Sequence, residues 1–234
     1  MTTAAVAIPI YKSQPTRAEQ RSFQQCIQIL GTHPICLVTP HQLDSTIYKQ
    51  LAGRPLKVIT FDHRFFESVK GYSELLLHRH FYSKFTDYNY ILIYQLDAWV
   101  FRDELLDWCQ QGFDYIGAPW LEAPPATTKK PFINLGPLLK NKVGNGGVSL
   151  RNVQSHLRWA PWLSFVFKFF PKNEDMLWSL LVPFKKPKPI HALRFAFEME
   201  PSRSYQLIEQ TLPFTCHAWE KYEPQFWEKF IQSE

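Results

Sequence analysis

The sequence predicts an α/β domain built on a mostly parallel sheet with helices on both faces. Short apolar runs alternate with amphipathic segments along the first hundred or so residues. Most of these runs are apolar throughout, which is typical of parallel strands buried on both faces. With 234 residues, of which 45% are hydrophobic and 20% charged, the chain can bury one core of this size.

The first half of the chain contains four expected strands. They are the β-branched or apolar runs Ala4–Ile10, Ile35–Thr39, Leu56–Phe61 and Tyr90–Tyr94. Phe23, Ile27 and Leu30 recur at helical spacing, which predicts a helix over Thr16–Leu30 that ends at Gly31. A similar pattern predicts a helix over Tyr72–Phe85. Ligands of such sheets bind beyond the carboxyl ends of the strands, so the residues that follow each strand are the first candidates for a site.

The aromatic segment Trp159–Phe170 has two interpretations. It can be a helix packed against the sheet, which we favour, or it can touch a membrane surface together with the nearby lysines. It is too short and too interrupted to span a bilayer.

Charge is concentrated in the middle of the chain. Eleven Lys and Arg between Ala126 and Lys188 stand against Glu174 and Asp175, so this segment carries +9 although the whole chain carries only +5. Such a segment indicates an anionic partner, such as nucleic acid, a phosphorylated sugar or a lipid, or else a solvated face. The sequence has no helix-turn-helix spacing, zinc finger or ribonucleoprotein motif, so we do not expect nucleic acid.

Cysteine usage and the first residues favour a cytoplasmic location. The four cysteines are neither dense nor paired as Cys-x-x-Cys, which predicts reduced thiols. The stretch Met1–Ile10 lacks the basic region and the uninterrupted apolar run of a secretory signal.

Asp97 is the first candidate for chemistry, because it follows the Tyr90–Tyr94 run directly. A carboxylate at the end of a buried strand needs a cation, a hydrogen-bond donor or water. Magnesium or manganese bridging Asp97 to a diphosphate meets that need. The alternative is an aspartate that caps a turn or the next helix.

Three glycines surround one asparagine in the segment Gly144, Asn145, Gly146 and Gly147. This segment is either a tight hairpin turn or a stretch of backbone against which a sugar can lie. A nucleotide-triphosphate phosphate loop is excluded, because the Gly-Lys-Ser/Thr sequence is missing.

Two further groups of residues could act chemically. Asn173 can cap a helix whose first turn contains Glu174 and Asp175, and an acid isolated among cations is also suited to act as a general base. His217 is either a hydrogen-bonded structural residue or a metal ligand.

These motifs together resemble a known bacterial family. The motifs are Gln95–Asp97, Phe113–Trp120, Gly144–Gly147, Asn173–Asp175 and His217–Trp219, which follow the Tyr90–Tyr94 run in this order. The family is catalogued as a domain of unknown function and is related to glycosyltransferases of the GT-A fold, and the resemblance runs from about Ala4 to Tyr222. It implies one GT-A-like domain over residues 1–234, with a nucleotide-binding half at about 1–100, an acceptor-binding half at about 101–234, and a smaller antiparallel element in the second half.

The resemblance also implies roles for individual residues. The nucleotide-sugar donor would contact Pro9, Ile10, Tyr11, Gly71, Tyr72, Gln95 and Asp97, and the acceptor sugar would contact Trp120, Gly144, Asn145, Gly146 and Gly147. Asp97 and His217 would bind Mn²⁺ or Mg²⁺. Asp175 would be the catalytic base, and Glu174 would orient the acceptor. Gln95 replaces the first acid of the family's Asp-x-Asp motif, so a metal-independent version with Lys or Arg on the diphosphate stays open.

The expected function is therefore sugar transfer from a nucleotide-diphosphate sugar to a hydroxyl of a glycan or glycolipid. We expect a metal-dependent, inverting enzyme of polysaccharide or lipopolysaccharide biosynthesis, with an anionic acceptor, in the cytoplasm or at the inner face of the membrane. A non-catalytic nucleotide- or carbohydrate-binding module is the main alternative, and a basic nucleic-acid-binding protein is a weaker one. A binding module has no use for both Asp97 and the Glu174–Asp175 pair.

Overall fold

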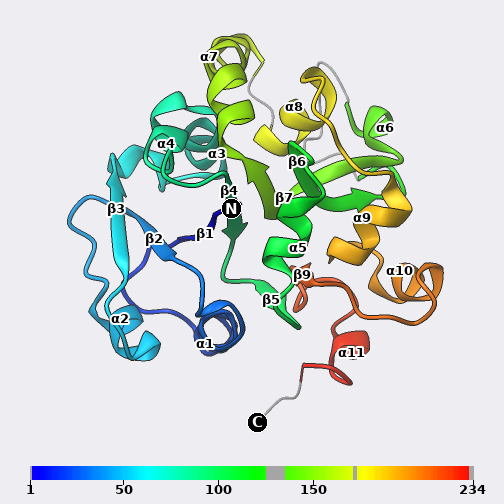
Figure 1. Cartoon of the computed structure of the whole chain (residues 1–234), viewed down its shortest axis with the longest axis horizontal. Helices are drawn as coiled ribbons and strands as arrows, with labels where there is room; N and C mark the ends of the chain where they lie inside the picture. The colour runs from blue at the N-terminus through cyan, green and yellow to red at the C-terminus, as the bar shows by residue number, and fades with distance from the viewer. Residues whose placement is uncertain (1, 125–134, 171–172, 232–234) are drawn as a thin grey trace.

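The structure is a computed structural model that describes residues 2–124, 135–170 and 173–231. The described residues form a six-stranded sheet in the order β3-β2-β1-β4-β7-β6 and a three-stranded sheet in the order β5-β9-β8 (Figure 1). The strands are β1 (Ala4–Pro9), β2 (Ile35–Pro40), β3 (Lys57–Phe61), β4 (Tyr90–Tyr94), β5 (Ala98–Val100), β6 (Tyr115–Trp120), β7 (Lys142–Asn152), β8 (Ala196–Phe197) and β9 (Thr215–His217).

Helices cover both faces of the large sheet, and the helices near the C-terminus pack around the small sheet. They are α1 (Arg17–Leu30), α2 (Thr46–Ala52), the 3-10 helix η1 (His63–Phe65), α3 (Val69–Leu77), α4 (Arg79–Ser83), α5 (Leu105–Gln110), α6 (Gly136–Leu139), α7 (Val153–Phe169), α8 (Glu174–Leu181), α9 (Pro189–Phe195), α10 (Pro201–Leu207) and α11 (Pro224–Trp227). The predicted α/β class is confirmed. The four expected strands and the first helix form close to their predicted bounds.

The first helix begins with a capping box. Thr16 Oγ1 accepts a hydrogen bond from the Glu19 amide at 3.3 Å, and Glu19 Oε2 accepts one from the Thr16 amide at 2.7 Å. Gly31 ends the helix, as the sequence predicts.

Strand direction divides the large sheet into two parts. Strands β1 to β4 are parallel, whereas β7 runs antiparallel to both β4 and β6. The N-terminal part of β7 therefore extends past the carboxyl end of β4, where the amide of Gln95 donates to the carbonyl of Gly147 at 3.1 Å. This arrangement places β7 at the sheet edge where ligands of such folds bind.

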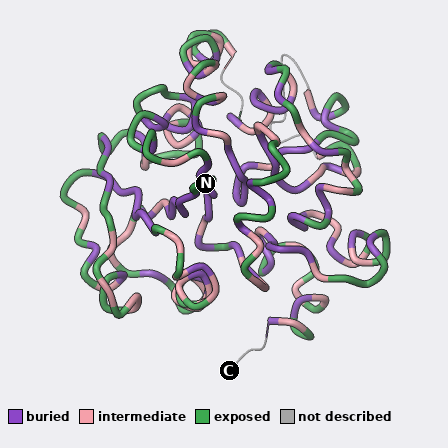
Figure 2. The backbone as a smooth tube through the Cα atoms, viewed as in Figure 1, coloured by how far each residue is buried: buried purple, intermediate pink, exposed green. Residues whose placement is uncertain are grey.

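Apolar side chains pack on both faces of the sheet, and the purple backbone of Figure 2 follows the strands. On one face α1, α2 and α5 bury Phe23, Tyr48 and Trp108. On the other face α3, α4, α7 and α8 contribute the second cluster, which contains Phe81 and Trp178.

Three local interpretations differ from the structure in whole or in part. The helix expected over Tyr72–Phe85 is two helices, because His78 adopts an extended conformation and its Nδ1 accepts from the amide of His80, which starts α4. The Gly144–Gly147 segment is not a hairpin turn, since it lies inside the eleven-residue strand β7. Asn173 stands at the N-cap of α8, but its side chain makes no capping hydrogen bond.

Candidate active site

A cavity of about 500 Å³ opens at the carboxyl ends of β1 and β4. Six of the residues expected to contact the donor line it: Pro9, Ile10, Tyr11, Tyr72, Gln95 and Asp97. Gly71 has a packing role instead, because a Cβ at this position would lie 2.4 Å from the Arg64 carbonyl oxygen of η1. The cavity thus brings together the end of β1, the start of α3 and the turn after β4.

Asp97 and His217 meet at one side of this cavity. The turn after β4 leads into β5, and β5 pairs with β9 so that Ala98 stands opposite His217. His217 Nε2 lies 3.1 Å from Asp97 Oδ1 and 3.3 Å from Gln95 Oε1. Burial opposes the charge of Asp97, but the hydrogen bond from His217 and its charge outweigh this effect and lower the pKa of Asp97.

Glu198 lies on the other side of the His217 ring. Its Oε1 is 3.2 Å from His217 Nδ1, which is close enough for an ion pair with the protonated imidazole. Burial disfavours the imidazolium, but Glu198 and Asp97 together outweigh it and raise the pKa of His217 to about 10. The sequence analysis missed Glu198. The signal available was an acid directly after the three apolar residues Phe195–Phe197, of which the last two form β8.

The donor atoms beside the cavity suit a divalent cation. Among the described residues, His, Cys, Asp and Glu form no cluster of three or more that could hold a metal. Beside this cavity, the third donor atom after Asp97 Oδ1 and His217 Nε2 is the side-chain amide oxygen of Gln95. Both oxygens face His217 Nε2. Oxygen and imidazole ligands of this kind suit Mn²⁺, and a carboxylate at the second ring nitrogen is a common support for a metal-binding histidine. The residues present therefore fit the expected metal.

Both carboxylate oxygens of Glu174 bind other side chains of the protein. Its Oε1 accepts from Arg151 Nη2 at 2.9 Å, and its Oε2 accepts from Ser73 Oγ at 3.4 Å. Arg151 is fully buried and also donates to the Tyr82 hydroxyl and to Ser149 Oγ. This ion pair fixes the start of α8 against β7 and α3. Arg151 was quoted with the glycine motif in the sequence but was not recognised as functional, because nothing in the local pattern indicates its partner.

Asp175 is placed differently from its neighbour Glu174. It is only partly buried, and its carboxylate accepts from the amides of Gly146 at 3.3 Å and Met176 at 2.6 Å. Burial and the charge of Glu174 raise the pKa of Asp175, and Glu198 adds to this effect. The charge of Glu198 therefore acts on the pKa of both Asp175 and His217.

The glycines of β7 give these side chains room. A Cβ on Gly147 would lie 2.0 Å from His217 Nε2, and one on Gly146 would lie 2.8 Å from Glu174 Oε1. Gly144, with a φ of +130°, lies against the Tyr115 ring. The three glycines are buried, whereas Asn145 is partly exposed. Glycine is needed at these three positions because neighbouring side chains occupy the space that a Cβ would fill.

Trp120 is the remaining predicted sugar contact. It ends β6, and its side chain is almost fully buried. It therefore presents little surface on which a sugar could stack.

The cations of the basic middle segment, Ala126 to Lys188, do not all face solvent. Arg151 is buried in the ion pair with Glu174, whereas Arg158 and Lys168 are exposed. Lys129, Lys130 and Lys172 lie outside the described residues.

A parallel sheet with β7 reversed beside β4, and an acid–histidine pair at its carboxyl edge, defines a fold of the GT-A glycosyltransferase type. Three solved structures share this fold. The glycosyltransferase GlyE of Streptococcus pneumoniae is 15% identical with a TM-score of 0.54, and the alignment covers 100% of this chain and 61% of GlyE. The galactosyltransferase LgtC with donor and acceptor sugar analogues is 13% identical with a TM-score of 0.55, covering 91% of this chain and 86% of LgtC. Core-mannan synthase A of Aspergillus fumigatus in its Mn/GDP form is 8% identical with a TM-score of 0.54, covering 77% and 69%.

The chain belongs to the family described as protein of unknown function DUF5672, which it matches over residues 55–217. This range includes Asp97, Asp175, Glu198 and His217. A comparison with curated proteins gives no match. The expected relationship between a family of unknown function and the GT-A fold is confirmed.

Proposed function

We propose that this protein is a glycosyltransferase that moves a sugar from a nucleotide-diphosphate sugar to a hydroxyl of a glycan or glycolipid. The observation that carries the proposal is the cavity at the ends of β1 and β4, with Asp97 and His217 in contact at its side. The fold shared with LgtC, which was solved with donor and acceptor sugar analogues, supports the same class of ligands.

The donor would lie in the cavity. Tyr11, whose side chain is 60% exposed, offers a ring at the mouth, and Pro9, Ile10 and Tyr72 complete the apolar walls. Gln95, Asp97 and His217 would hold a divalent cation, as the Mn/GDP form of core-mannan synthase A suggests. When bound, such a cation would stabilise the charge of the departing diphosphate.

Asp175 would act as the general base. A carboxyl group whose pKa is raised toward neutrality takes up a proton more readily than an ordinary aspartate. It would accept the proton of the acceptor hydroxyl as that oxygen attacks the anomeric carbon, with inversion at this carbon. Glu174 spends both oxygens on Arg151 and Ser73, so we assign it the positioning of α8.

The remaining parts of this proposal concern the acceptor and the location. The exposed cations of the middle segment suit an anionic acceptor, as in polysaccharide or lipopolysaccharide biosynthesis. Cys26, Cys36, Cys109 and Cys216 are all free and buried, which supports a reducing, cytoplasmic location. No helix among the described residues is both long and apolar enough to cross a membrane.

Thermal-shift measurements against nucleoside diphosphates, with and without Mn²⁺, test this proposal first. We expect one nucleotide to raise the melting temperature by mass action when Mn²⁺ is present. Release of that diphosphate from its sugar conjugate would then be followed. Binding without release, even with acceptor glycans added, would favour the non-catalytic binding module. Stabilisation by no nucleotide would contradict both the transferase and a nucleotide-binding module.

A further inference from the structure

Helix α7 is apolar on two opposite faces. Its inner face buries Val153, His156, Ala160, Leu163 and Phe167 against the sheet. Its outer face exposes 43% of Trp162, 60% of Phe165 and 75% of Phe169. The favoured interpretation of a helix packed against the sheet is confirmed, and the outer face of this helix remains exposed.

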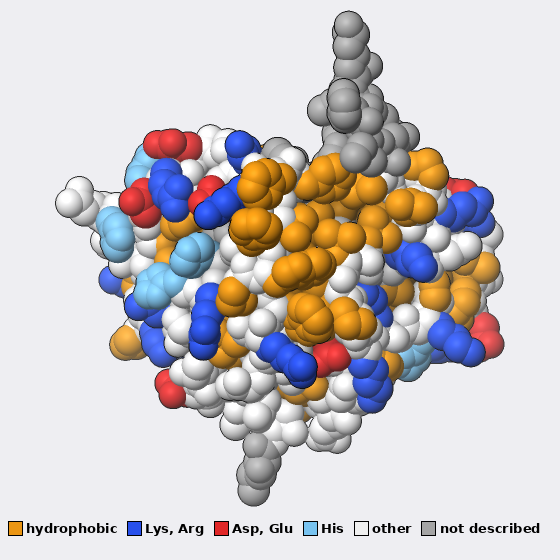
Figure 3. Space-filling model, turned by 90° about the horizontal axis from the view of Figure 1, so that it is seen from above, with side chains coloured by type: hydrophobic (Ala, Val, Ile, Leu, Met, Phe, Trp, Pro, Cys, Tyr) orange, Lys and Arg blue, Asp and Glu red, His pale blue; other side chains and the backbone are white. Residues whose placement is uncertain are grey.

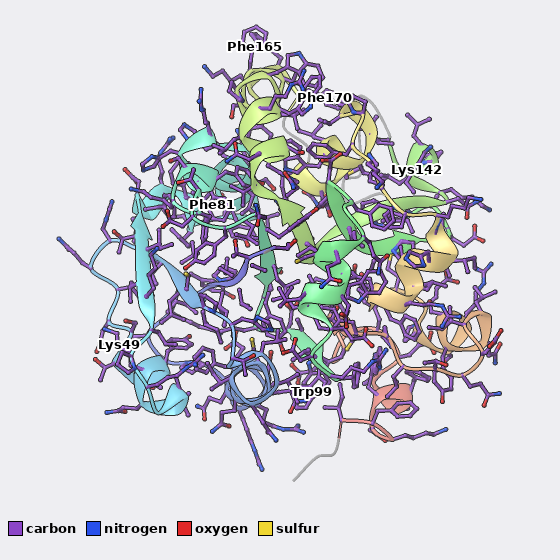
Figure 4. All side chains as sticks on the ribbon, in the orientation of Figure 1. Lys49, Phe81, Trp99, Lys142, Phe165 and Phe170 are labelled. Atoms are coloured by element: carbon purple, nitrogen blue, oxygen red, sulfur yellow. The ribbon has the colours of Figure 1, made fainter. Side chains whose placement is uncertain are left out.

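The outer aromatic residues lie together because they recur every three or four positions. The rings of Phe165 and Phe169 are 5.2 Å apart, and those of Trp159 and Trp162 are 5.9 Å apart. Figure 4 shows Phe165 at the outermost end of the molecule, pointing away from the sheet. Such projecting rings differ from scattered surface hydrophobics, which need no explanation.

The surface around these rings is basic. Helix α7 contains no Asp or Glu, and α3 and α4 beside it contain one acid, Glu74, which pairs with Arg64 at 3.2 Å. The exposed cations on these three helices are Lys70, Arg79, Arg158 and Lys168, and Lys84 is exposed at the C-cap of α4. Figure 3, which looks onto this side, shows hydrophobic side chains gathered at its centre with Lys and Arg around them.

We propose that this side of the molecule docks on an anionic lipid bilayer through the outer face of α7. Phe165, Phe169 and Trp162 would enter the interfacial region, and the surrounding cations would attract acidic headgroups. A protein partner is less well matched, since the exposed aromatic rings lie among like charges. They belong to α7, which stands at the edge of the molecule (Figure 1).

The docked face continues toward the cavity. Ser164 Oγ of α7 donates to the Leu77 carbonyl at the end of α3 at 2.8 Å, and the first residues of α3, with Val69 70% exposed, line the cavity. A bilayer on this face would therefore lie along a helix that begins at the proposed donor site. The position of the bilayer relative to a donor site rests on the proposed function, whereas the docking on lipid does not.

Vesicle co-sedimentation of the full chain tests the docking. We expect binding to vesicles of phosphatidylcholine mixed with phosphatidylglycerol, weaker binding to phosphatidylcholine alone, and weakening by added salt. Phe165→Glu with Phe169→Glu should reduce binding at least about tenfold, since two exposed rings would no longer enter the interface. Leu207→Glu, on the 44%-exposed Leu207 of α10, is the matched control and should bind normally.

A second variant is needed because the double Phe variant could lose binding through misfolding alone. Arg158→Gln with Lys168→Gln keeps the aromatic rings and should reduce binding to anionic vesicles by about fivefold for each charge. Equal binding of this pair and the unmodified chain would overturn the proposal. Absence of vesicle binding by the unmodified chain would also overturn it, as would self-association that the double Phe variant abolishes. None of these measurements involves sugar transfer, so they remain informative if the proposed activity is not found.

Discussion

His217 Nε2 lies 3.1 Å from Asp97 Oδ1, and this contact joins strands β5 and β9 at the edge of the cavity. The family resemblance paired these two residues as metal ligands, but no local pattern in the sequence links them. The antiparallel pairing of Ala98 with His217 sets their distance, so the smaller sheet serves to assemble this pair.

Replacing Asp97 by Ala should abolish Mn²⁺-dependent nucleotide binding, because the carboxylate is the charged oxygen donor of the set. Calorimetry with and without Mn²⁺ measures this effect. Asp107→Ala, an exposed aspartate on α5, is the control and should bind like the unmodified chain. Unchanged metal dependence in Asp97→Ala would remove this residue from the site.

Replacing Asp175 by Asn should lower turnover by at least about a hundredfold, while nucleotide affinity stays within a factor of a few. Loss of a positioned base has an effect of this size, whereas the side-chain volume is nearly conserved. Diphosphate release with acceptor present measures the turnover. Full activity of the variant would assign the base to another residue.

The rate should also depend on pH through Asp175. Burial and the charge of Glu174 raise the pKa of Asp175 to about 7, and only the ionised carboxylate can accept a proton. The turnover number should therefore rise about tenfold per pH unit below neutrality and level off above it. The residual rate of Asp175→Asn should lack this rise. A flat profile for the unmodified enzyme would contradict the assignment.

Gly147→Ala should destabilise the protein by about 1–3 kcal/mol, because the added methyl group overlaps the His217 imidazole. Denaturant unfolding measures the free energy. In a His217→Ala background the same substitution should cost much less, since the ring is gone. Equal costs in both backgrounds would show that the strain arises elsewhere.

Arg151→Met should cost about 3–5 kcal/mol, because it leaves Glu174 buried without its cation. Adding Glu174→Gln should recover part of this loss. Arg158→Met, on the exposed side of α7, should change the free energy of unfolding by less than about 0.5 kcal/mol. If Arg151→Met and Arg158→Met had similar effects, the buried ion pair would not stabilise the start of α8.

Local patterns predicted the first half of the fold well. Strands β1, β2 and β4 are buried on both faces, so each appears in the sequence as a mostly apolar run. The edge strand β3 buries only Ile59 and Phe61, and the alternation of these two residues was enough to predict it. The break at His78 was missed because the apolar spacing continues across it. The structural mark of the break is a hydrogen bond from the His80 amide to the His78 side chain.

The second half was predicted less well because its key contacts are tertiary. Glu198 follows a strand of two residues, which is too short to produce a pattern. The glycines of β7 resemble a turn in the sequence, yet they lie in a strand because His217, Glu174 and Tyr115 come from distant segments to cover them. The family resemblance implied a sugar contact at Trp120, and the near-complete burial of its side chain could not be known from the sequence.

Successive side chains of a strand point to opposite sides, so Gly146 and Gly147 leave space toward the acidic end of α8 and toward the imidazole respectively. Inserting a single residue before Val143 would leave both spaces in place, because the pairing of β7 with β4 begins at Val148. The same insertion between Gly147 and Val148 would turn the glycine pair over and direct neighbouring side chains into both openings. Insertions and deletions among related sequences should therefore occur before Val143 and should be absent between Gly147 and Val148.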